Sequence, residues 1–143
     1  WNTRELLNAA QKKEGKSIKH DISLPIKTIP SFLKQAKSKI ERIYKNCSIL
    51  AFGHLADGNL HYNVGLPNNI NKKKFEVLYR KVNRVVFDLV YKLNGSFSAE
   101  HGIGKMKIKE LIKYSNKQEI EFKKSLKRLI DKKNIMNPGK IFK

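Results

Sequence analysis

The chain has 143 residues, of which 31 are basic and 12 are acidic, giving a net charge of +19. This length is enough for one domain with a buried core. The longest apolar run, residues 82–91, contains charged side chains and is too short to span a bilayer. A single cysteine, Cys47, excludes an internal disulfide and fits a reducing compartment. We therefore expect a cytoplasmic protein, with peripheral contact to the inner face of the membrane as an alternative. The first residue is Trp1, so we expect a piece of a longer protein.

The large positive charge has three interpretations: an anionic membrane, a nucleic acid, or compositional drift. The lysines are scattered, and asparagine and isoleucine are also abundant, as a genome rich in A and T would produce. The arginine clusters and aromatic platforms that typify nucleic-acid surfaces are missing from the sequence. We therefore favour drift over a membrane, and a membrane over a nucleic acid.

The first half of the chain alternates between helical and strand patterns. Residues 1–11 predict a helix, and residues 19–25 alternate polar with apolar side chains up to a proline, as a strand does. Pro30 opens a helix that extends to Tyr44. Residues 47–52 and 59–66 predict two strands of a hairpin.

The second half is mainly helical. Residues 72–94 carry apolar side chains at helical spacing, before a left-handed stop at Asn94-Gly95. A strand-like piece begins at Ser96 and a short helix follows Gly104. A last helix begins at Ser115 with Leu126, Leu129 and Ile130 facing inward, and residues 136–142 form turns. The order predicts an α+β fold: a ferredoxin-like antiparallel sheet with helices on one face, plus C-terminal helices.

The pair Asp57-Gly58 predicts a two-residue hairpin loop. Side chains alternate along a strand, so such a loop puts two histidines opposite each other on one face. The expected pairs are Ala56 with Asn59, Leu55 with Leu60, His54 with His61, and Phe52 with Asn63, and the face with the histidines also holds Phe52 and Asn63.

Two opposed imidazoles can bind one metal ion if a third ligand is near. Glu100 is the candidate, because Gly102 and Gly104 allow the backbone to bend after it. With His54 and His61 it makes a two-histidine, one-carboxylate set, which suits zinc, manganese or ferrous iron. The alternative is that both histidines only fill a half-buried sheet face.

Three motifs stand out along the chain: Gly53-His54 with Asp57-Gly58-Asn59-Leu60-His61, Ser98-Ala99-Glu100-His101-Gly102-Ile103-Gly104, and Asn137-Pro138-Gly139-Lys140. Together they resemble the C-terminal domain of FAD-linked oxidases, the family of D-lactate dehydrogenase, the glycolate oxidase FAD subunit and D-2-hydroxyglutarate dehydrogenase. The resemblance runs the whole length of the chain. It implies a ferredoxin-like cap on the substrate side of a flavin, and the flavin would be held by an N-terminal domain that is absent from this chain.

The resemblance also implies roles for single residues. His54, His61 and Glu100 correspond to ligands of a divalent metal, such as zinc or manganese. Asn63 and His101 correspond to substrate contacts, His101 being the base. Arg4 and Lys19 correspond to the residues that hold the substrate carboxylate, while Asn8 and Ala56 depart from the family pattern. Asn137, in the tail, corresponds to a contact with the cofactor.

The implied function is that of a flavin-dependent D-2-hydroxy acid dehydrogenase, in which hydride passes from C2 of the substrate to FAD while a metal polarises the hydroxyl. Its partners would be a small 2-hydroxy acid, the N-terminal FAD domain, and an electron acceptor such as a quinone, a cytochrome or an electron-transfer flavoprotein. The chain alone should be colourless and inactive. Two alternatives remain: a metal-dependent hydrolase and a basic nucleic-acid-binding module.

Overall fold

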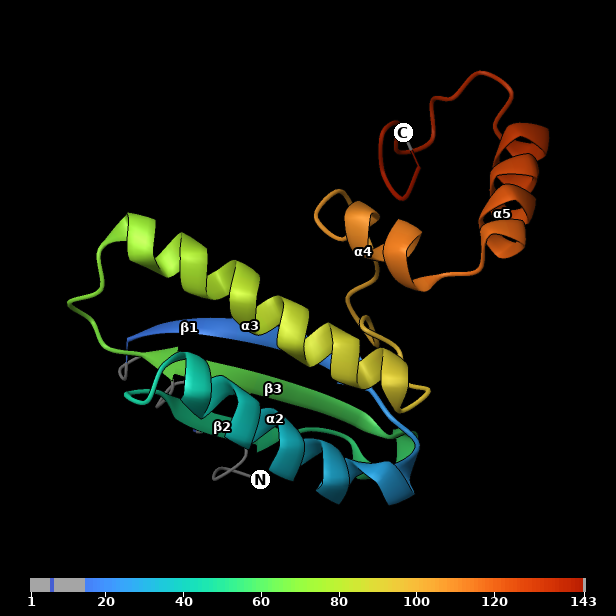
Figure 1. Ribbon diagram of the computed structural model, residues 1–143. Helices are drawn as coiled ribbons and strands as arrows, with labels where there is room; N and C mark the ends of the chain where they lie inside the picture. The colour runs from blue at the N-terminus through green and yellow to red at the C-terminus, as the bar shows by residue number, and fades with distance from the viewer. Residues whose placement is uncertain (1–5, 7–14, 143) are drawn as a thin grey trace. The chain divides into compact units, whose positions relative to one another are not determined.

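The computed structural model describes residue 6 and residues 15–142 (Figure 1). The chain forms two compact units, Trp1–Glu100 and His101–Lys143. The helix expected at residues 1–11 lies outside the described residues, apart from Leu6. The described part of the first unit contains β1 (Lys16–Ser23), α2 (Ile29–Ile43), β2 (Ser48–Phe52), β3 (Asn59–Leu66) and α3 (Lys72–Lys92), with short 3-10 helices η1 (Ile26–Thr28) and η2 (Leu55–Asp57).

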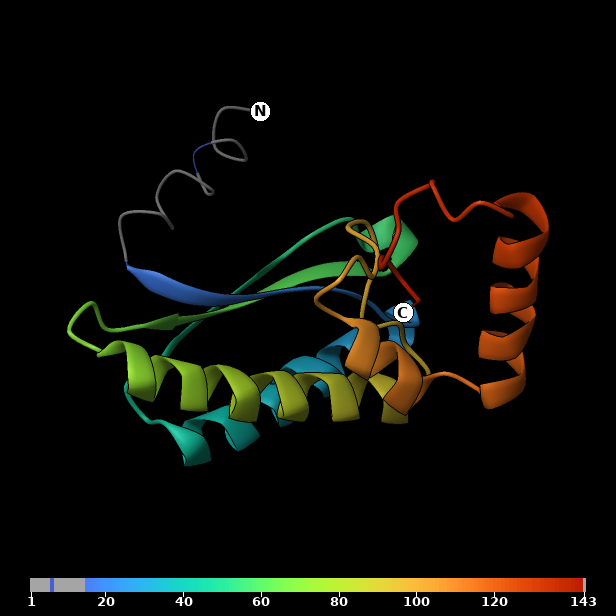
Figure 2. The ribbon, with the colours of Figure 1, turned by 90° about the horizontal axis from the view of Figure 1, so that it is seen from above.

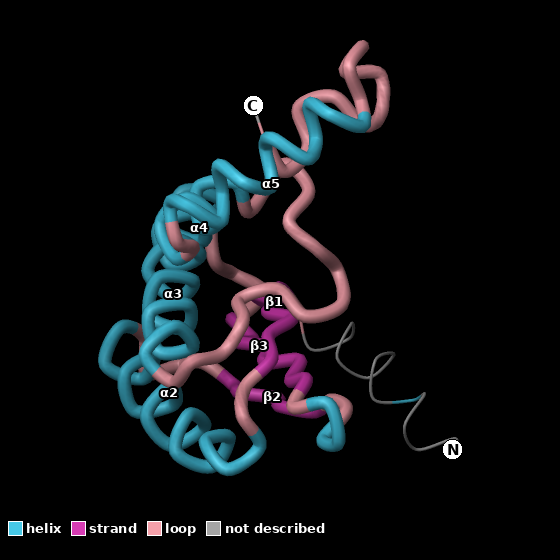
Figure 3. Tube along the Cα trace, turned by 90° about the vertical axis from the view of Figure 1, so that its right-hand side faces the viewer, coloured by secondary structure: helices cyan, strands magenta, loops and turns pink. Residues whose placement is uncertain are grey.

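The three strands form an antiparallel sheet in the order β1-β3-β2, so β3 lies in the middle. Helices α2 and α3 both cover the same face of this sheet, as Figures 1 and 3 show. The even-numbered residues of β3 are buried on that face, and the odd-numbered ones face the opposite way. This confirms the expected α+β class with helices on one face. The buried even-numbered side chains are Leu60, Tyr62, Val64 and Leu66.

Helix α3 forms where the periodic apolar pattern predicted it. Asn71 caps its first turn by accepting a hydrogen bond of 2.8 Å from the backbone N–H of Lys74. Asn94, in the left-handed conformation at φ 57°, follows its end. Figure 2 shows that α3 runs beside α2 along the sheet. The buried stripe consists of Leu78, Val82, Val86, Phe87, Leu89 and Val90.

The core also contains a histidine that takes no part in the metal set. His20 is only 4% exposed, and its Nδ1 donates a hydrogen bond of 2.8 Å to the carbonyl of Tyr62. Its Nε2 lies 2.9 Å from the side-chain amide of Asn83, and its ring meets Phe87 edge-on. Because both ring nitrogens are engaged in the interior, His20 joins β1, β3 and α3.

The fourth strand of a ferredoxin-like sheet is present only as a single bridge. Ser96 pairs with Ser23 at the outer edge of β1, through hydrogen bonds of 2.8 and 2.9 Å. This is the place that a fourth strand would take. Among the described residues the sheet therefore has three full strands, because the chain leaves the ladder immediately after this pair.

The hairpin between β2 and β3 differs from the expected one. Phe52 pairs with His61 rather than with Asn63, a shift of two residues. The loop is longer because residues 55–57 form a 3-10 turn, and only Gly58 has a positive φ, of 65°. A two-residue type I′ loop would need positive φ at Asp57 as well, which a 3-10 turn followed by a left-handed glycine avoids. Ala56 consequently lies in this turn and not in a strand, while a shift of two keeps each side chain on its expected face.

The second unit contains α4 (Ile108–Tyr114) and α5 (Lys117–Ile130). Asn116, not Ser115, caps α5 by accepting a hydrogen bond of 2.8 Å from the N–H of Gln118. The expected inward face of α5 is wrong for the described residues: Leu126, Leu129 and Ile130 are 41%, 69% and 72% exposed. The helix is amphipathic, but Ile120 is the one buried residue among the described residues of α5. The tail after α5 consists of turns, as expected.

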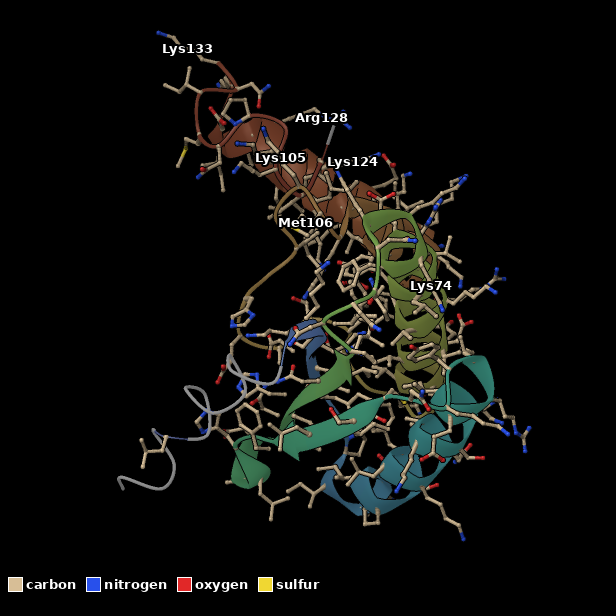
Figure 4. The ribbon with its side chains drawn as sticks, turned by 90° about the vertical axis from the view of Figure 1, so that its left-hand side faces the viewer. Lys74, Lys105, Met106, Lys124, Arg128 and Lys133 are labelled. Carbon is tan, nitrogen blue, oxygen red and sulfur yellow. The ribbon has the colours of Figure 1, made fainter. Side chains whose placement is uncertain are left out.

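None of the described helices is long and apolar enough to cross a bilayer. The positive charge is distributed over the helices and turns of both units. In Figure 4, for example, Lys133 extends outward from the turn that follows α5.

Gly58→Ala tests the loop geometry. A Cβ at this position would lie 2.1 Å from the carbonyl oxygen of Leu24, and φ is +65°. The clash adds to the left-handed strain of about 1–2 kcal/mol, so we expect a loss of about 3 kcal/mol in the free energy of unfolding, within the range of strained core positions. Thermal unfolding followed by circular dichroism measures it.

Gly102→Ala is the matched control for this prediction. Its φ is +71°, yet a Cβ there meets nothing within 4 Å. It should show the left-handed strain alone, about 1–2 kcal/mol. Equal losses in the two variants would contradict the close contact between Gly58 and Leu24.

Candidate metal centre

Three side chains of the types that bind metals converge in the first unit, near the beginning of the central strand β3. His54 Nε2 lies 3.3 Å from Glu100 Oε1, and His61 Nε2 lies 3.5 Å from Glu100 Oε2. The two imidazole centroids are 6.2 Å apart. One donor atom from each residue can be chosen so that all three lie within 4.8 Å of one another. The sequence prediction of this trio is thus consistent with the structure, although the hairpin register behind it was wrong.

Different segments position the three side chains. His61 lies in the central strand β3 and packs against Phe52 of β2, with ring centroids 5.2 Å apart. His54 precedes η2, where its carbonyl accepts hydrogen bonds of 3.1 Å from the N–H groups of Asp57 and Asn59. Glu100 ends the segment that begins with the Ser96 bridge. The longer loop therefore brings His54 beside His61 without direct strand pairing.

Two of the separations between donor atoms match a small divalent cation. Tetrahedral coordination at about 2.0–2.2 Å places neighbouring donor atoms about 3.3–3.6 Å apart. The distances from Glu100 to the imidazoles, 3.3 and 3.5 Å, lie in this range but involve different carboxylate oxygens, and one donor atom from each residue gives separations within 4.8 Å. The side chains of His54 and Glu100 are 39% and 46% exposed, so the cluster is open on one side. It could therefore keep positions for a substrate or water, as catalytic sites do.

Asp21 is a fourth residue at this cluster, and the sequence reasoning did not identify it. It lies opposite His61 in the β1–β3 pairing and is 4% exposed. Its Oδ1 is 3.9 Å from His61 Nδ1, and its Oδ2 accepts a hydrogen bond of 2.8 Å from the N–H of Glu100. The alternation of polar side chains along β1 could have indicated its face, but only the register with β3 shows which residue it meets.

The expected substrate contacts Lys19 and Asn63 lie on the same open face as His61. They are cross-strand partners in β1 and β3. Asn63 is 4% exposed, whereas Lys19 is exposed. The predicted carboxylate-binding Arg4 lies outside the described residues, as does Asn8. The structure thus places one basic residue and one amide on the face that carries the histidine of β3.

The other two expected site residues belong to the second unit. His101 follows Glu100 directly in the chain and is exposed. Asn137 has a left-handed backbone with φ of 51° and lies in the turns after α5. Each is accessible within its own unit, and the roles of both stay predictions.

The second unit also carries a basic hollow of about 640 Å³ between α5 and the tail. Among the described residues that line it, Asp131 is the only acidic one, and its carboxylate is paired with Lys127. Side-chain hydrogen bonding with Lys127 lowers the pKa of Asp131. The lining contains no histidine or cysteine, so its chemistry differs from that of the metal cluster. The cationic lining residues are Lys124, Lys127, Arg128, Lys132 and Lys140.

The whole chain matches a known family: the model for "FAD linked oxidases, C-terminal domain" covers residues 1–141. The chain therefore belongs to the FAD-linked oxidase family, by its C-terminal domain. It is 40% identical over 143 residues to a D-2-hydroxyglutarate dehydrogenase of Stutzerimonas stutzeri, covering 99% of this chain and 30% of that protein. It is 32% identical to the mitochondrial D-2-hydroxyglutarate dehydrogenase of Arabidopsis thaliana, covering 99% of this chain and 24% of that one.

Another relative is named for a different substrate. The glycolate oxidase subunit GlcD of Bacillus subtilis is 33% identical over 141 residues, covering 97% of this chain and 29% of that protein. The chain thus spans about a quarter to a third of the length of the curated relatives it matches.

Glu100→Gln tests whether the cluster binds a cation. The amide keeps the size of the side chain but removes its charge, so affinity for Zn²⁺ or Mn²⁺ should fall by more than the roughly 10–100-fold that outer-shell changes cost. Titration of the protein with each ion, after treatment with a chelator, measures it.

Asp57→Asn is the control for this prediction. Asp57 is an exposed carboxylate three residues from His54 and lies outside the trio. Its variant should bind the ion as the parent does. If both variants bound with the affinity of the parent, the site would not be a metal centre.

Proposed function

We propose that this chain is the substrate- and metal-binding cap of a flavin-dependent D-2-hydroxy acid dehydrogenase. The observation that carries the proposal is the convergence of His54, His61 and Glu100 in a chain of the FAD-linked oxidase family. The relatives named D-2-hydroxyglutarate dehydrogenase reach 40% identity, so D-2-hydroxyglutarate is the first substrate to test, before glycolate and D-lactate.

The cluster suits a hydroxy acid because of its donor set and its open side. In such a site a divalent ion would lower the pKa of the substrate hydroxyl, and FAD would accept the hydride. The donor atoms of His54, His61 and Glu100 fit zinc or manganese. FAD would be held mainly by an N-terminal domain, with Asn137 as a contact from this chain.

The face beside the cluster suits a carboxylate. Lys19 offers a positive charge and Asn63 an amide, side by side across β1 and β3. A substrate carboxylate held there would receive charge-assisted hydrogen bonds, which are stronger than neutral ones. Arg4 would add a forked donor to the same group. In this proposal these residues fix the orientation of the acid, so that its hydroxyl points toward the histidines.

His101 is the proposed general base. Imidazole is the side chain most often used as a general base in enzymes. His101 directly follows Glu100 in the sequence, so the proposed base is the residue next to a proposed metal ligand. It would take the hydroxyl proton at a ring nitrogen as hydride leaves C2.

The partners and location follow from this proposal. A reduced flavin must pass its electrons to an acceptor, and a quinone, a cytochrome or an electron-transfer flavoprotein would serve. We propose a cytoplasmic enzyme, with contact to the inner face of the membrane if the acceptor is a quinone. In this proposal the partners are flavin, a hydroxy acid and an electron acceptor, and nucleic acid is not a partner.

His101→Asn in the full-length flavoprotein tests the function and the base together. It should keep the metal and cut the rate of anaerobic flavin reduction by D-2-hydroxyglutarate about 10²–10⁴-fold, the range for losing a general base. His54→Asn should lose both the metal and the reduction. Metal content and stopped-flow flavin absorbance are measured on the same preparations.

Two results would contradict these roles. Loss of metal in His101→Asn would make His101 a ligand rather than the base. If no D-2-hydroxy acid reduced the flavin while the protein hydrolysed an ester or amide with oxidised flavin unchanged, the site would be a hydrolase. Flavin absorbance separates the two chemistries, because hydrolysis needs no electron acceptor.

Lys19→Ala tests the carboxylate contact. The variant loses a hydrogen bond between charged groups, which is worth about 1.5–3 kcal/mol of free energy. Its kcat/KM should fall by the corresponding factor, with metal content unchanged. Lys39→Ala is the control, since Lys39 is an exposed lysine on α2, which covers the other face of the sheet. If the parent and Lys19→Ala had equal kinetics with glycolate, D-lactate and D-2-hydroxyglutarate, Lys19 would not contact the substrate carboxylate.

A further inference from the structure

Asp21 is a buried carboxylate whose contacts join two of the three proposed ligands. It is 4% exposed, and an ionised carboxylate is costly to bury unless hydrogen bonds or charges satisfy it. Its Oδ1 accepts a hydrogen bond of 2.9 Å from the side-chain amide of Asn59. Its Oδ2 accepts one of 2.8 Å from the N–H of Glu100, and Oδ1 also faces His61 Nδ1 at 3.9 Å.

The two ring nitrogens of His61 have different neighbours. Nε2 faces Glu100 at 3.5 Å, and Nδ1 faces Asp21. Since both nitrogens face a carboxylate, a bound cation would decide the tautomer: an ion held between Glu100 and Nε2 uses the lone pair of Nε2, and the proton then lies on Nδ1, beside Asp21. The strand pairing fixes this arrangement, because Asp21 and His61 are directly opposed in the β1–β3 ladder.

The hydrogen bond between Asp21 and Glu100 involves the backbone of Glu100, not its side chain. Glu100 comes after the single bridge at Ser96, where regular strand pairing has ended. The hydrogen bond from its N–H to Asp21 Oδ2, together with one of 3.3 Å from the N–H of Ala99 to the carbonyl of Asp21, ties this segment to β1. One residue of β1 therefore locates the third ligand against the central strand.

We propose that Asp21 is a positioning residue that stabilises the Nδ1–H tautomer of cation-bound His61 and fixes the backbone of Glu100, and so preorganises the cation site. This inference rests on the proposed metal centre. A purely structural role, in which Asp21 only attaches the segment of residues 98–100 to β1, would leave the tautomer of His61 and the cation affinity unaffected by its charge.

Asp21→Asn separates the two roles. The amide has nearly the same shape, and its oxygen can still accept from the N–H of Glu100. Its NH₂ group would then replace Oδ1, and the buried Oδ1 of Asn59, which has no hydrogen-bond partner among the described residues, can accept from it if the Asn59 amide turns over. The NH₂ group would also face His61 Nδ1 and oppose the proton that must lie there when a cation binds Nε2. In the full-length flavoprotein we expect affinity for Zn²⁺ or Mn²⁺ to fall about 10–100-fold, as for other outer-shell partners of metal-bound histidines.

The tautomer is read directly by NMR of protein labelled with ¹⁵N-histidine and titrated with Zn²⁺. His61→Asn assigns the signals by their loss. With the ion added, the parent should show a metal-bound Nε2 and a protonated Nδ1 at His61, and Asp21→Asn should reach this state only at a higher concentration of Zn²⁺. If Asp21→Asn does not fold, the parent spectrum still decides: an Nε2–H tautomer there would overturn the proposal.

Asp131→Asn is the matched control. Asp131 is also a buried carboxylate, 7% exposed, and accepts hydrogen bonds of 3.0 Å from the N–H groups of Ile135 and Met136 in the second unit. Its variant should leave cation affinity and the His61 signals unchanged.

The outcomes separate this inference from the proposed function. If Glu100→Gln and Asp21→Asn both bind the ion as the parent does, the metal centre itself is wrong. If Glu100→Gln loses the ion while Asp21→Asn keeps both affinity and tautomer, the cation site stands and only the positioning role of Asp21 is overturned.

Discussion

The pairing of β3 with strands on both sides is the constraint on which the site depends. Once β3 is central, alternation sends Tyr62 and Val64 to the helices and His61 and Asn63 to the open face. A shift of one residue in the β1 register would turn the side chains of β1 to the opposite faces of the sheet. It would also replace Asp21 by a neighbour opposite His61. The burial of the even-numbered side chains against α2 and α3 therefore fixes the chemistry on the other side of the sheet.

The site combines one rigid element with two irregular segments. His61 comes from the paired strand β3, whereas His54 and Glu100 come from segments outside the ladder. Such segments have few backbone hydrogen bonds of their own, so other contacts must hold them. The His54 carbonyl, which receives two N–H groups, and the Asp21 carboxylate supply these contacts. In this way a cluster with an open side is built on a paired sheet.

The two units differ in how completely they bury their apolar surface. The first has a core of strand and helix side chains, while α5 of the second leaves Leu129 and Ile130 exposed. The chain spans at most about a third of its relatives' length, and the sequence prediction for α5 assumed a partner inside this chain. Since these side chains are exposed, no element in the described part of the second unit covers this face of α5. Amphipathic periodicity reports which face is apolar, not what covers it.

The sequence by itself determined the elements with strong periodicity and the residue types of the site. Helix α3 and strand β3 lie where their patterns predicted, and His54, His61 and Glu100 were identified from the motifs that hold them. Tertiary structure decided the hairpin register, the length of its loop, the loss of a full fourth strand and the place of Asp21. The physical reason is that periodicity and turn residues act within a few positions, whereas register depends on how distant segments pack. Asp21 and His61 are 40 positions apart in the chain, and only the β1–β3 ladder makes them neighbours.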